Sequence, residues 1–311
     1  IMENYIQDSI IGTGAYGTVY KVKCVKTGEW FALKCHSYGA EDATVRELSC
    51  LTALKGHPNV INMLDCFVDQ GLGIISTLMP YVPYTLSEVI HNGHGLKFQV
   101  YQGREIQLLP LTFVGHFSVQ VANALSYMHR LNMVHRDLTP SNVLLTEDLT
   151  VKVADMGLSR LSSKRMSPTV VTEPYRAPEL FDPKCQEYTC AIDMWSLGVM
   201  IADAMEGQVV FSGRKIHREP VSTYQIIVRT LCPKDHPSAD IASWDPDTII
   251  PNVMECEPVK RIVFRLLAFR ENERLLAHAL LEDTKWIKLS RMTREEKNMV
   301  IDRIARKGTQ C

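Results

Sequence analysis

The sequence predicts an α+β protein with two lobes, one built mainly from β-strands and the other mainly from α-helices. Residues 5–35 and 60–80 carry short runs rich in Val, Ile, Tyr and Phe, broken by Gly and Pro, which is typical of strands. No repeat or low-complexity linker interrupts the chain, so both lobes belong to one compact unit. From about residue 112 the apolar patterns are longer and have helical spacing, at 112–130, 189–206, 221–231 and 258–269.

One helix is expected inside the strand-rich part, over residues 41–54. The Lys-Gly-His-Pro sequence at 55–58 favours the end of the helix at that point. The side of this helix that is expected to face the core carries Val45, Leu48, Leu51 and Leu54.

The expected boundaries place a strand-rich lobe at residues 1–82 and a helical lobe at 83–287. Residues 91–110 lack sustained periodicity and are predicted to form a surface insertion. A capping pattern, Thr-x-x-Glu, begins at Thr293, so residues 288–311 are expected to form a helical tail.

The composition is that of an ordinary globular protein, with 46% hydrophobic and 22% charged residues among 311. Lys and Arg number 34 against 35 Asp and Glu, so no global field points to nucleic acid or an acidic membrane. The nine cysteines are scattered, without the paired spacing of a zinc site, which indicates a reducing compartment. No apolar run reaches the roughly 18 to 20 residues that span a bilayer. We therefore expect a soluble intracellular protein.

Three glycines with the spacing G-x-G-x-x-G, Gly12, Gly14 and Gly17, lie between apolar runs at 5–11 and 19–25. Glycines let a hairpin lie flat over phosphate groups and offer backbone N–H groups to them. A dinucleotide-binding turn is excluded because no helix follows the third glycine. Alone, the pattern also fits a tight turn in any β-sheet.

Lys34 directly follows three apolar residues, Phe-Ala-Leu, in a predicted strand. A lysine in such a strand would usually point to solvent. Glu47 lies one turn before Leu51 on the core-facing edge of the predicted helix. A carboxylate at that edge is costly unless it is paired. An ion pair between Lys34 and Glu47 satisfies both groups.

Two apolar runs around residues 147–148 predict a hairpin that brings Asp137, Asn142 and Asp155 together at its open end. Oxygen ligands from an Asp and an Asn suit Mg²⁺, and a separate Asp can accept a hydroxyl proton. Three unrelated loop side chains are the alternative. It is the weaker one, because the glycine loop, the Lys34–Glu47 pair and this cluster agree with one another.

Taken together, these motifs resemble those of the eukaryotic protein kinases, over residues 3 to about 288. Residues 177–179 (Ala-Pro-Glu) match the family's A-P-E signature, and Arg274 stands where the family pairs an Arg with that Glu. Residues 193–198 are similar to its buried central helix. The resemblance implies the kinase fold, with a β-rich N-lobe that carries one regulatory helix and a mainly helical C-lobe.

Within the family, the sequence resembles the cyclin-dependent kinases of the CMGC group. Residues 43–47 (Ala-Thr-Val-Arg-Glu) are similar to their P-S-T-A-I-R-E cyclin-binding helix. The resemblance implies a Mg-ATP-dependent serine/threonine kinase that acts on protein substrates. It also implies a cyclin-like activator bound through the helix at residues 43–47.

The resemblance further implies a role for each matching residue. Lys34 would hold the α- and β-phosphates of ATP, and Glu47 would hold Lys34. Asn142 and Asp155 would hold Mg²⁺, and Asp137 would orient or deprotonate the substrate hydroxyl. The remaining residues expected to bind ATP are Ile11, Gly12, Gly14, Gly17, Val19, Ala32, Met79 as gatekeeper, Pro80, Tyr81 and Val82 of the hinge, and Leu144.

Regulation and substrate binding are also implied by matching positions. Arg46, Arg136 and Arg160 correspond to arginines that converge on an activation-loop phosphate, here expected on Ser167 or Thr169. Tyr16 matches an inhibitory phosphorylation site of the family. The substrate-binding segment is similar at Val170, Val171, Thr172 and Glu173.

Three departures from the family pattern leave alternatives open. Thr139 stands where such kinases place a Lys that contacts the transferred phosphate, which keeps a pseudokinase scaffold as an alternative. Met156 replaces the Phe of D-F-G with another apolar side chain. Glu173 and Pro174 alter the region that receives the substrate residue after the phosphoacceptor. A mitogen-activated-type kinase is a further alternative, although no T-x-Y activation motif is present.

Overall fold

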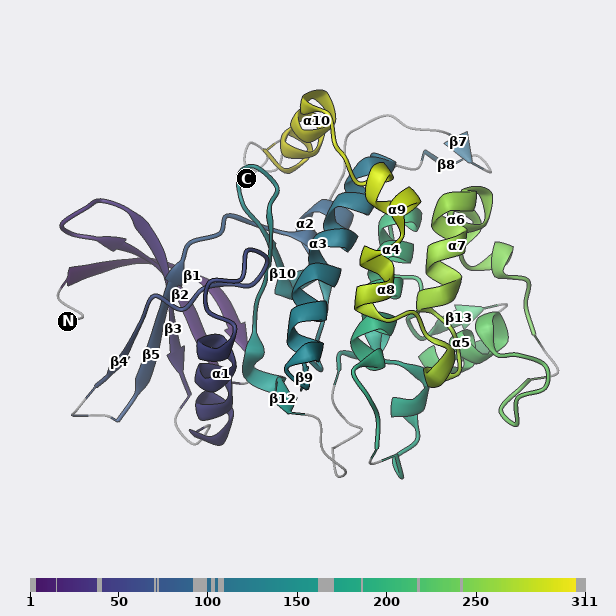
Figure 1. Ribbon diagram of the computed structural model, residues 1–311, viewed down its shortest axis with the longest axis horizontal. Helices are drawn as coiled ribbons and strands as arrows, with labels where there is room; N and C mark the ends of the chain where they lie inside the picture. Colours follow the sequence, from purple (N-terminus) through teal and green to yellow (C-terminus); the bar gives the residue numbers. More distant parts are fainter. Residues whose placement is uncertain are drawn as a thin grey trace.

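The computed structural model has the two lobes that the sequence predicts, side by side along the longest axis (Figure 1). A β-sheet and one helix form the first lobe, and helices dominate the second, which confirms the α+β class. The structure describes residues 4–14, 16–37, 41–69, 71, 73–91, 100–101, 104–105, 109–161, 171–185, 187–216, 219–240 and 243–305.

The first lobe is an antiparallel sheet of five strands in the order β1-β2-β3-β5-β4. Its own small core consists of Val22, Leu33, Phe67 and Leu78. The strands are β1 (Tyr5–Gly14), β2 (Gly17–Cys24), β3 (Trp30–His36), β4 (Asp65–Val68) and β5 (Ile75–Pro80).

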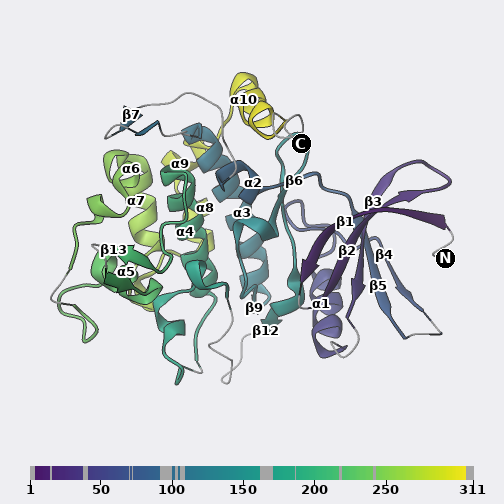
Figure 2. The same ribbon diagram turned by 180° about the vertical axis from the view of Figure 1, so that it is seen from behind.

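Helix α1 (Glu41–Ala53) lies between this sheet and the second lobe (Figures 1 and 2). Ala43, Glu47 and Leu51 face the interior, as a stripe of helical spacing requires. The prediction that Val45 belongs to that stripe is wrong, because its side chain is 58% exposed. Val45 lies two residues from both Ala43 and Glu47, which turns it to the opposite face of the helix.

The second lobe is organised around α4 (Ala191–Glu206), which is buried on nearly every side and thus confirms the predicted core helix. It packs against α3 (Leu111–Arg130) and α7 (Glu257–Leu266). The other helices of this lobe are α2 (Leu86–His91), α5 (Thr223–Leu231), α6 (Pro251–Glu255), α8 (Ala277–Leu281) and α9 (Thr284–Leu289).

Short strand pairs lie between these helices. The predicted hairpin before Asp155 is confirmed as β10 paired with β11. Helix α5 begins two residues later than expected, because Val221 belongs to β14 and Ser222 forms a reciprocal capping box with Gln225. The strands are β6 (Tyr84–Thr85), β9 (Met133–Val134), β10 (Val143–Leu145), β11 (Val151–Val153), β12 (Arg160–Leu161), β13 (Arg214–Ile216) and β14 (Glu219–Val221).

Most of the predicted surface insertion lies outside the described residues, apart from the strand pair β7 (Val100–Tyr101) and β8 (Arg104–Glu105). Its last part departs from the prediction, because Leu109 is buried in the main core. In the tail, α10 (Arg294–Ala305) begins at the predicted capping box, in which Thr293 and Glu296 bond each other's backbone N–H. Across the described part of the chain, no helix combines the length and apolar character needed to cross a membrane.

Asp203, in the buried helix α4, makes the stability of the fold depend on pH. Its carboxylate accepts hydrogen bonds from the Tyr175 hydroxyl (2.8 Å) and the Val210 N–H (2.9 Å), near His91 (3.8 Å). Burial raises the pKa of Asp203 to about 7, and also that of Glu206. Because the unfolded carboxyls ionise near pH 4, the stability that the raised pKa provides is present at low pH. It is lost as the pH rises through about 7.

Asp203→Asn is therefore expected to flatten the pH dependence of unfolding. Between pH 5 and pH 8 the free energy of unfolding should fall in both proteins. The fall should be about 1–3 kcal/mol smaller in the variant than in the wild type. Urea denaturation at several pH values measures this difference. The exposed Asp302→Asn serves as the matched control, and equal slopes for Asp203→Asn and wild type would contradict the assignment.

Candidate active site

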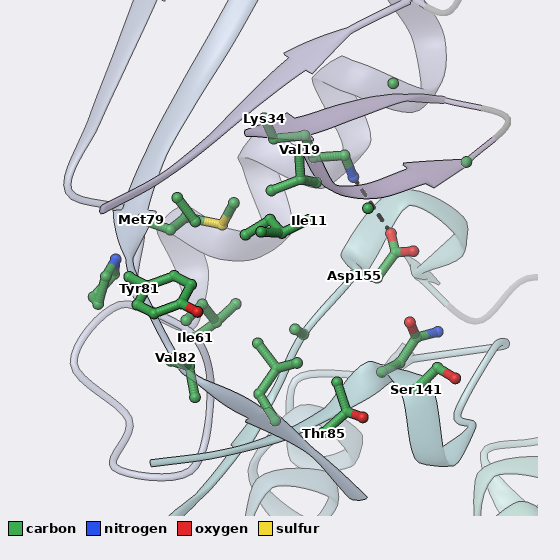
Figure 3. Close-up of a pocket in the computed structure, with 18 of the residues that line it drawn as sticks. Ile11, Val19, Lys34, Ile61, Met79, Tyr81, Val82, Thr85, Ser141 and Asp155 are labelled. Atoms are coloured by element: carbon green, nitrogen blue, oxygen red, sulfur yellow. Dashed lines mark hydrogen bonds and ion pairs between the residues drawn. The ribbon is translucent and has the colours of Figure 1, made fainter. Parts of the chain in front are cut away.

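A cavity of about 660 Å³ lies between the two lobes (Figure 3). Side chains of β1, β2 and β3 form its roof, and residues around β10 and just after β11 form its floor. Lys34 reaches from the roof toward Asp155, while Met79 and Tyr81 lie at the other end. The cavity thus has one charged end and one apolar end.

Every residue that the sequence suggested for ATP binding lies on the wall of this cavity. The apolar end is enclosed by side chains from both lobes, which suits a flat aromatic ring. The predicted residues on the wall are Ile11, Gly12, Gly14, Gly17, Val19, Ala32, Lys34, Met79, Pro80, Tyr81, Val82 and Leu144.

Several wall residues were not suggested by the sequence. Ile61 follows α1 at a distance from every motif. Beyond the hinge, Thr85 ends β6 and Glu88 lies in the first turn of α2. Ser141 and Ala154 are direct neighbours of Asn142 and Asp155, so adjacency to those motifs was the available signal. Ile61 carried no such signal, because only the packing of the lobes brings it to the cavity.

Gly17 is the glycine whose position the fold most strictly requires. A Cβ atom there would lie 2.4 Å from the backbone oxygen of Cys35 and 3.1 Å from the Cα of His36. A side chain at Gly14 would meet open space. Gly17 therefore lets β2 approach β3 closely, whereas Gly14 leaves the roof of the cavity free of side chains.

The expected pair of Lys34 and Glu47 is present. Lys34 Nζ donates to both carboxylate oxygens of Glu47 at 2.7 Å and to Asp155 Oδ1 at 3.4 Å. Burial would lower the pKa of Lys34, but Glu47 and Asp155 raise it above its usual value. Burial also opposes the charge of Asp155, yet Lys34 and His135 lower its pKa. A cation flanked by carboxylates thus occupies the charged end of the cavity.

Asp193, the first acidic residue of α4, holds the loop that carries Asp137. Its buried carboxylate accepts the backbone N–H groups of His135 (2.9 Å) and Arg136 (3.0 Å), as well as the His129 imidazole (2.9 Å). Burial opposes a charge on His129, but its bond to Asp193 helps to raise its pKa to about 9. The loop is therefore fixed to a helix that is buried on nearly every side.

Asp137 and Asn142 are in contact, as expected. The Asn142 Nδ2 donates to the Asp137 carbonyl at 2.8 Å and approaches the Asp137 carboxylate at 3.5 Å. The Thr172 hydroxyl donates to Asp137 Oδ1 at 2.8 Å, and the Thr172 N–H does so at 3.1 Å. The Asp137 carboxylate therefore already accepts a hydroxyl hydrogen from the chain itself.

Arg136 is within electrostatic reach of the other two arginines of the expected cluster, Arg46 and Arg160. It is 5% exposed, and its Nε and Nη1 find no hydrogen-bond partner among the described residues. Burial lowers its pKa, and the nearby charges of Arg160 and Arg46 lower it further. Like charges that act on a buried arginine are costly without an anion to offset them. Ser167, Thr169 and Val170 lie outside the described residues.

Val171 has the backbone of a left-handed residue, with a φ of 70°. Such a conformation is strained for a β-branched side chain. The Val171 carbonyl accepts hydrogen bonds from Arg176 Nε (3.2 Å) and Nη2 (2.9 Å), which holds it in this conformation. Beyond Thr172, Glu173 is exposed.

The remaining positions singled out in the sequence are also placed. Tyr16 lies on the cavity wall. Met156 is fully buried and fills an apolar site next to Asp155. Thr139, in the loop that carries Asp137, is 7% exposed. Its side chain is neutral, so it brings no charge to that loop. The expected pair of Arg274 with Glu179 is formed, at 2.7 and 3.0 Å.

The chain matches the protein kinase domain family over residues 5–287. It is 34% identical over 219 residues to cell division control protein 2 homolog 3 of Trypanosoma brucei brucei, covering 68% of this chain and 65% of that protein. It is 32% identical to a probable CTD kinase subunit alpha homolog of Encephalitozoon cuniculi, covering 67% and 59%. The chain therefore spans less than two thirds of the length of these two relatives.

A longer match joins the chain to the mitogen-activated protein kinase Hog1 of Zymoseptoria tritici, 30% identical over 304 residues, 91% of this chain and 79% of that protein. Among solved structures, a chain of the CAK complex from Chaetomium thermophilum bound to ATP-gamma-S is similar, with a TM-score of 0.74. The two share 24% identity, and the match covers 94% of each chain. That likeness concerns the fold alone.

Proposed function

This chain belongs to the protein kinase domain family, and from that premise we propose that it transfers the γ-phosphoryl group of ATP to serine or threonine hydroxyls of protein substrates. One observation carries the proposal most strongly. The Lys34–Glu47 pair and Asp155 stand at the charged end of the cavity, on the roof and the floor. Phosphoryl transfer depends mainly on positioning and on stabilisation of charge, which such an arrangement can supply.

The cavity suits ATP in both size and polarity. Ile11, Val19 and Leu144 offer apolar surface to the adenine ring, and the hinge at residues 80–82 offers backbone groups to its edge. Pro80 has no N–H, so only its carbonyl can serve there. The flat glycine roof leaves room for the phosphates, and Lys34 extends from the roof toward Asp155 (Figure 3).

The residues present also fit a magnesium ion. Asp155 is a carboxylate whose lowered pKa keeps it ionised, and 46% of its side chain is accessible. Asn142 uses its nitrogen toward Asp137, which leaves the amide oxygen as the atom that a cation would use. Hard oxygen donors are what Mg²⁺ prefers. When bound, the ion would neutralise phosphate charge.

Asp137 would receive the substrate hydroxyl. Its contact with the Thr172 hydroxyl supports this role, because the carboxylate already accepts an O–H hydrogen in the same place. A carboxylate so placed orients the attacking oxygen and takes its proton. Thr139 supplies no cation to the transferred phosphate, so we expect a lower rate than a lysine at that position would allow.

We propose two levels of control. Val45, exposed on the outer face of α1, supports docking of a cyclin-like protein there, which would hold Glu47 against Lys34. The two unpartnered nitrogens of Arg136, with Arg46 and Arg160 nearby, support the binding of a phosphate carried by Ser167 or Thr169. A phosphate would bring about −1.5 to −2 charges to this cluster.

Substrate selection is expected to favour proline after the phosphoacceptor. Thr172 contacts Asp137, so Val171 adjoins the place of the substrate hydroxyl. Because Arg176 already occupies the Val171 carbonyl, an N–H from the next substrate residue would be left without an acceptor. Proline has no N–H and avoids that cost of about 1–3 kcal/mol, which corresponds to a preference of roughly 5- to 150-fold.

A peptide array with Mg-ATP tests the proposed phosphoryl transfer and the proposed preference for proline. Label from the γ-position of ATP should pass to Ser and Thr peptides, and label from the α-position should not. Among matched peptides, Ser-Pro should react faster than Ser-Ala by the stated factor. Absence of any transfer, with and without cyclin-type partners, would favour the pseudokinase alternative, whereas equal rates for the two peptides would contradict only the proline preference.

A further inference from the structure

His36, the last residue of β3, is a buried imidazole that no motif or match assigns to a role. It is 5% exposed, and its Nε2 lies 2.9 Å from the hydroxyl of Thr77 on β5. Its other nitrogen, Nδ1, has no hydrogen-bond partner among the described residues. Buried polar atoms without a partner are rare in proteins, so this one requires an explanation.

The unpartnered nitrogen faces the carboxylate of Glu47. The distance from Nδ1 to Glu47 Oε2 is 3.8 Å, about 1 Å longer than a hydrogen bond. Lys34 Nζ is the donor to both oxygens of that carboxylate. Each carboxylate oxygen can accept more than one hydrogen, so Oε2 has capacity for a second donor.

The imidazole can serve as that donor because it is neutral. Burial and the charge of Lys34 lower the pKa of His36 to about 4, against a smaller opposing effect of Asp155. A charged imidazolium would compete with Lys34 for Glu47, whereas a neutral ring donates one hydrogen without doing so. If the Thr77 hydroxyl donates to Nε2, the remaining hydrogen of the ring is on Nδ1 and faces Glu47.

His36 is also tied by strand pairing to other residues of the site. Its register partner on β2 is Gly17, the glycine that packs against β3 most closely. Thr77, on β5, is in turn the register partner of Lys34 on β3. His36 and Lys34 are thus held by the same sheet, and an approach of about 1 Å between the imidazole and the Glu47 carboxylate would close the gap. Long contacts in catalytic sites without substrate commonly tighten when the substrate binds.

We propose that His36 is a positioning residue, whose Nδ1–H closes on Glu47 Oε2 and so helps to hold that carboxylate on Lys34. The kinetic part of this inference rests on the proposed kinase function. The contact between His36 and Glu47 can be measured without any turnover, so the positioning role and the proposed kinase function can fail separately.

Kinetics of three variants test the positioning role. His36→Leu fills the space without offering a hydrogen-bond donor. It should lower kcat about 3- to 10-fold, which corresponds to the free energy of one hydrogen bond. The KM for ATP should change little. His36→Gln retains a donor and should recover most of that loss. In a Glu47→Gln background, His36→Leu should cause no further loss. Equal kcat values for His36→Leu and wild type would overturn the proposal.

Nitrogen NMR of the imidazole provides the readout that does not depend on activity. The His36 ring should be the tautomer with hydrogen on Nδ1, and the Nδ1 resonance should shift in Glu47→Gln but not in the control Asp302→Asn. A tautomer with hydrogen on Nε2, or no response to Glu47→Gln, would overturn the proposal even if the protein is an active kinase. An inactive wild type with the expected shift would refute the proposed function alone.

Discussion

Asp137→Asn is expected to remove nearly all phosphate transfer while leaving ATP binding intact. The amide cannot take the proton of the substrate hydroxyl, and a positioned acid–base group contributes about 10²- to 10⁴-fold to a rate. The fold of the loop should survive, because Asp193 holds it through the backbone of His135 and Arg136. Steady-state transfer of γ-label and calorimetric binding of an ATP analogue measure the two effects.

Two comparisons make this expectation specific. The exposed Asp247→Asn, in the helical lobe, should transfer phosphate at the wild-type rate. Asp155→Asn should weaken the binding of Mg-ATP, because Asp155 lies on the cavity wall. Transfer by Asp137→Asn at the wild-type rate would exclude Asp137 from the mechanism.

Arg274→Ala is expected to cause the largest loss of stability of any single change considered. Arg274 is 3% exposed and bonds Glu179 with two nitrogens, at 2.7 and 3.0 Å. It also donates to the carbonyls of Ala191 (3.1 Å) and Ala268 (3.2 Å). Truncation leaves a partly buried carboxylate and two carbonyls without their donor. The free energy of unfolding should therefore fall by about 3–5 kcal/mol. Urea denaturation measures it.

The matched control is Arg270→Ala, which removes a solvent-exposed pair with Asp235 and should change stability little. Arg274→Lys keeps the charge but not the two-nitrogen contact, so it should fall between alanine and wild type. A loss in Arg274→Ala no larger than that in Arg270→Ala would show that the pair with Glu179 contributes little to the fold.

The sequence predicted those features that follow from local chemistry. The strand pattern around Gly12, Gly14 and Gly17 indicated a flat hairpin, and the apolar helix predicted at residues 189–206 could only be buried. Lys34 and Glu47 were each too costly to bury alone, so their residue types and positions were enough to predict that they pair. Such inferences need only periodicity, turn chemistry and the cost of burying charge.

Other features were decided by the tertiary structure, because they depend on which surfaces meet. Val45 was expected in the core, yet the stripe of α1 that packs inward begins at Ala43 and leaves Val45 in solvent. Leu109 was expected at the surface and is buried in the main core. The contacts of Val171 with Arg176, and of His36 with Glu47, join positions whose residue types give no local signal.

The sequence by itself therefore determined the two-lobed kinase fold and the charged groups of its site, since each of these has a local signature. The tertiary structure decided which buried polar atoms find no partner among the described residues, as at Arg136, and which face one another, as at His36 and Glu47. The physical reason is that pairing and burial depend on distances between segments far apart in the chain, which only packing of the two lobes fixes.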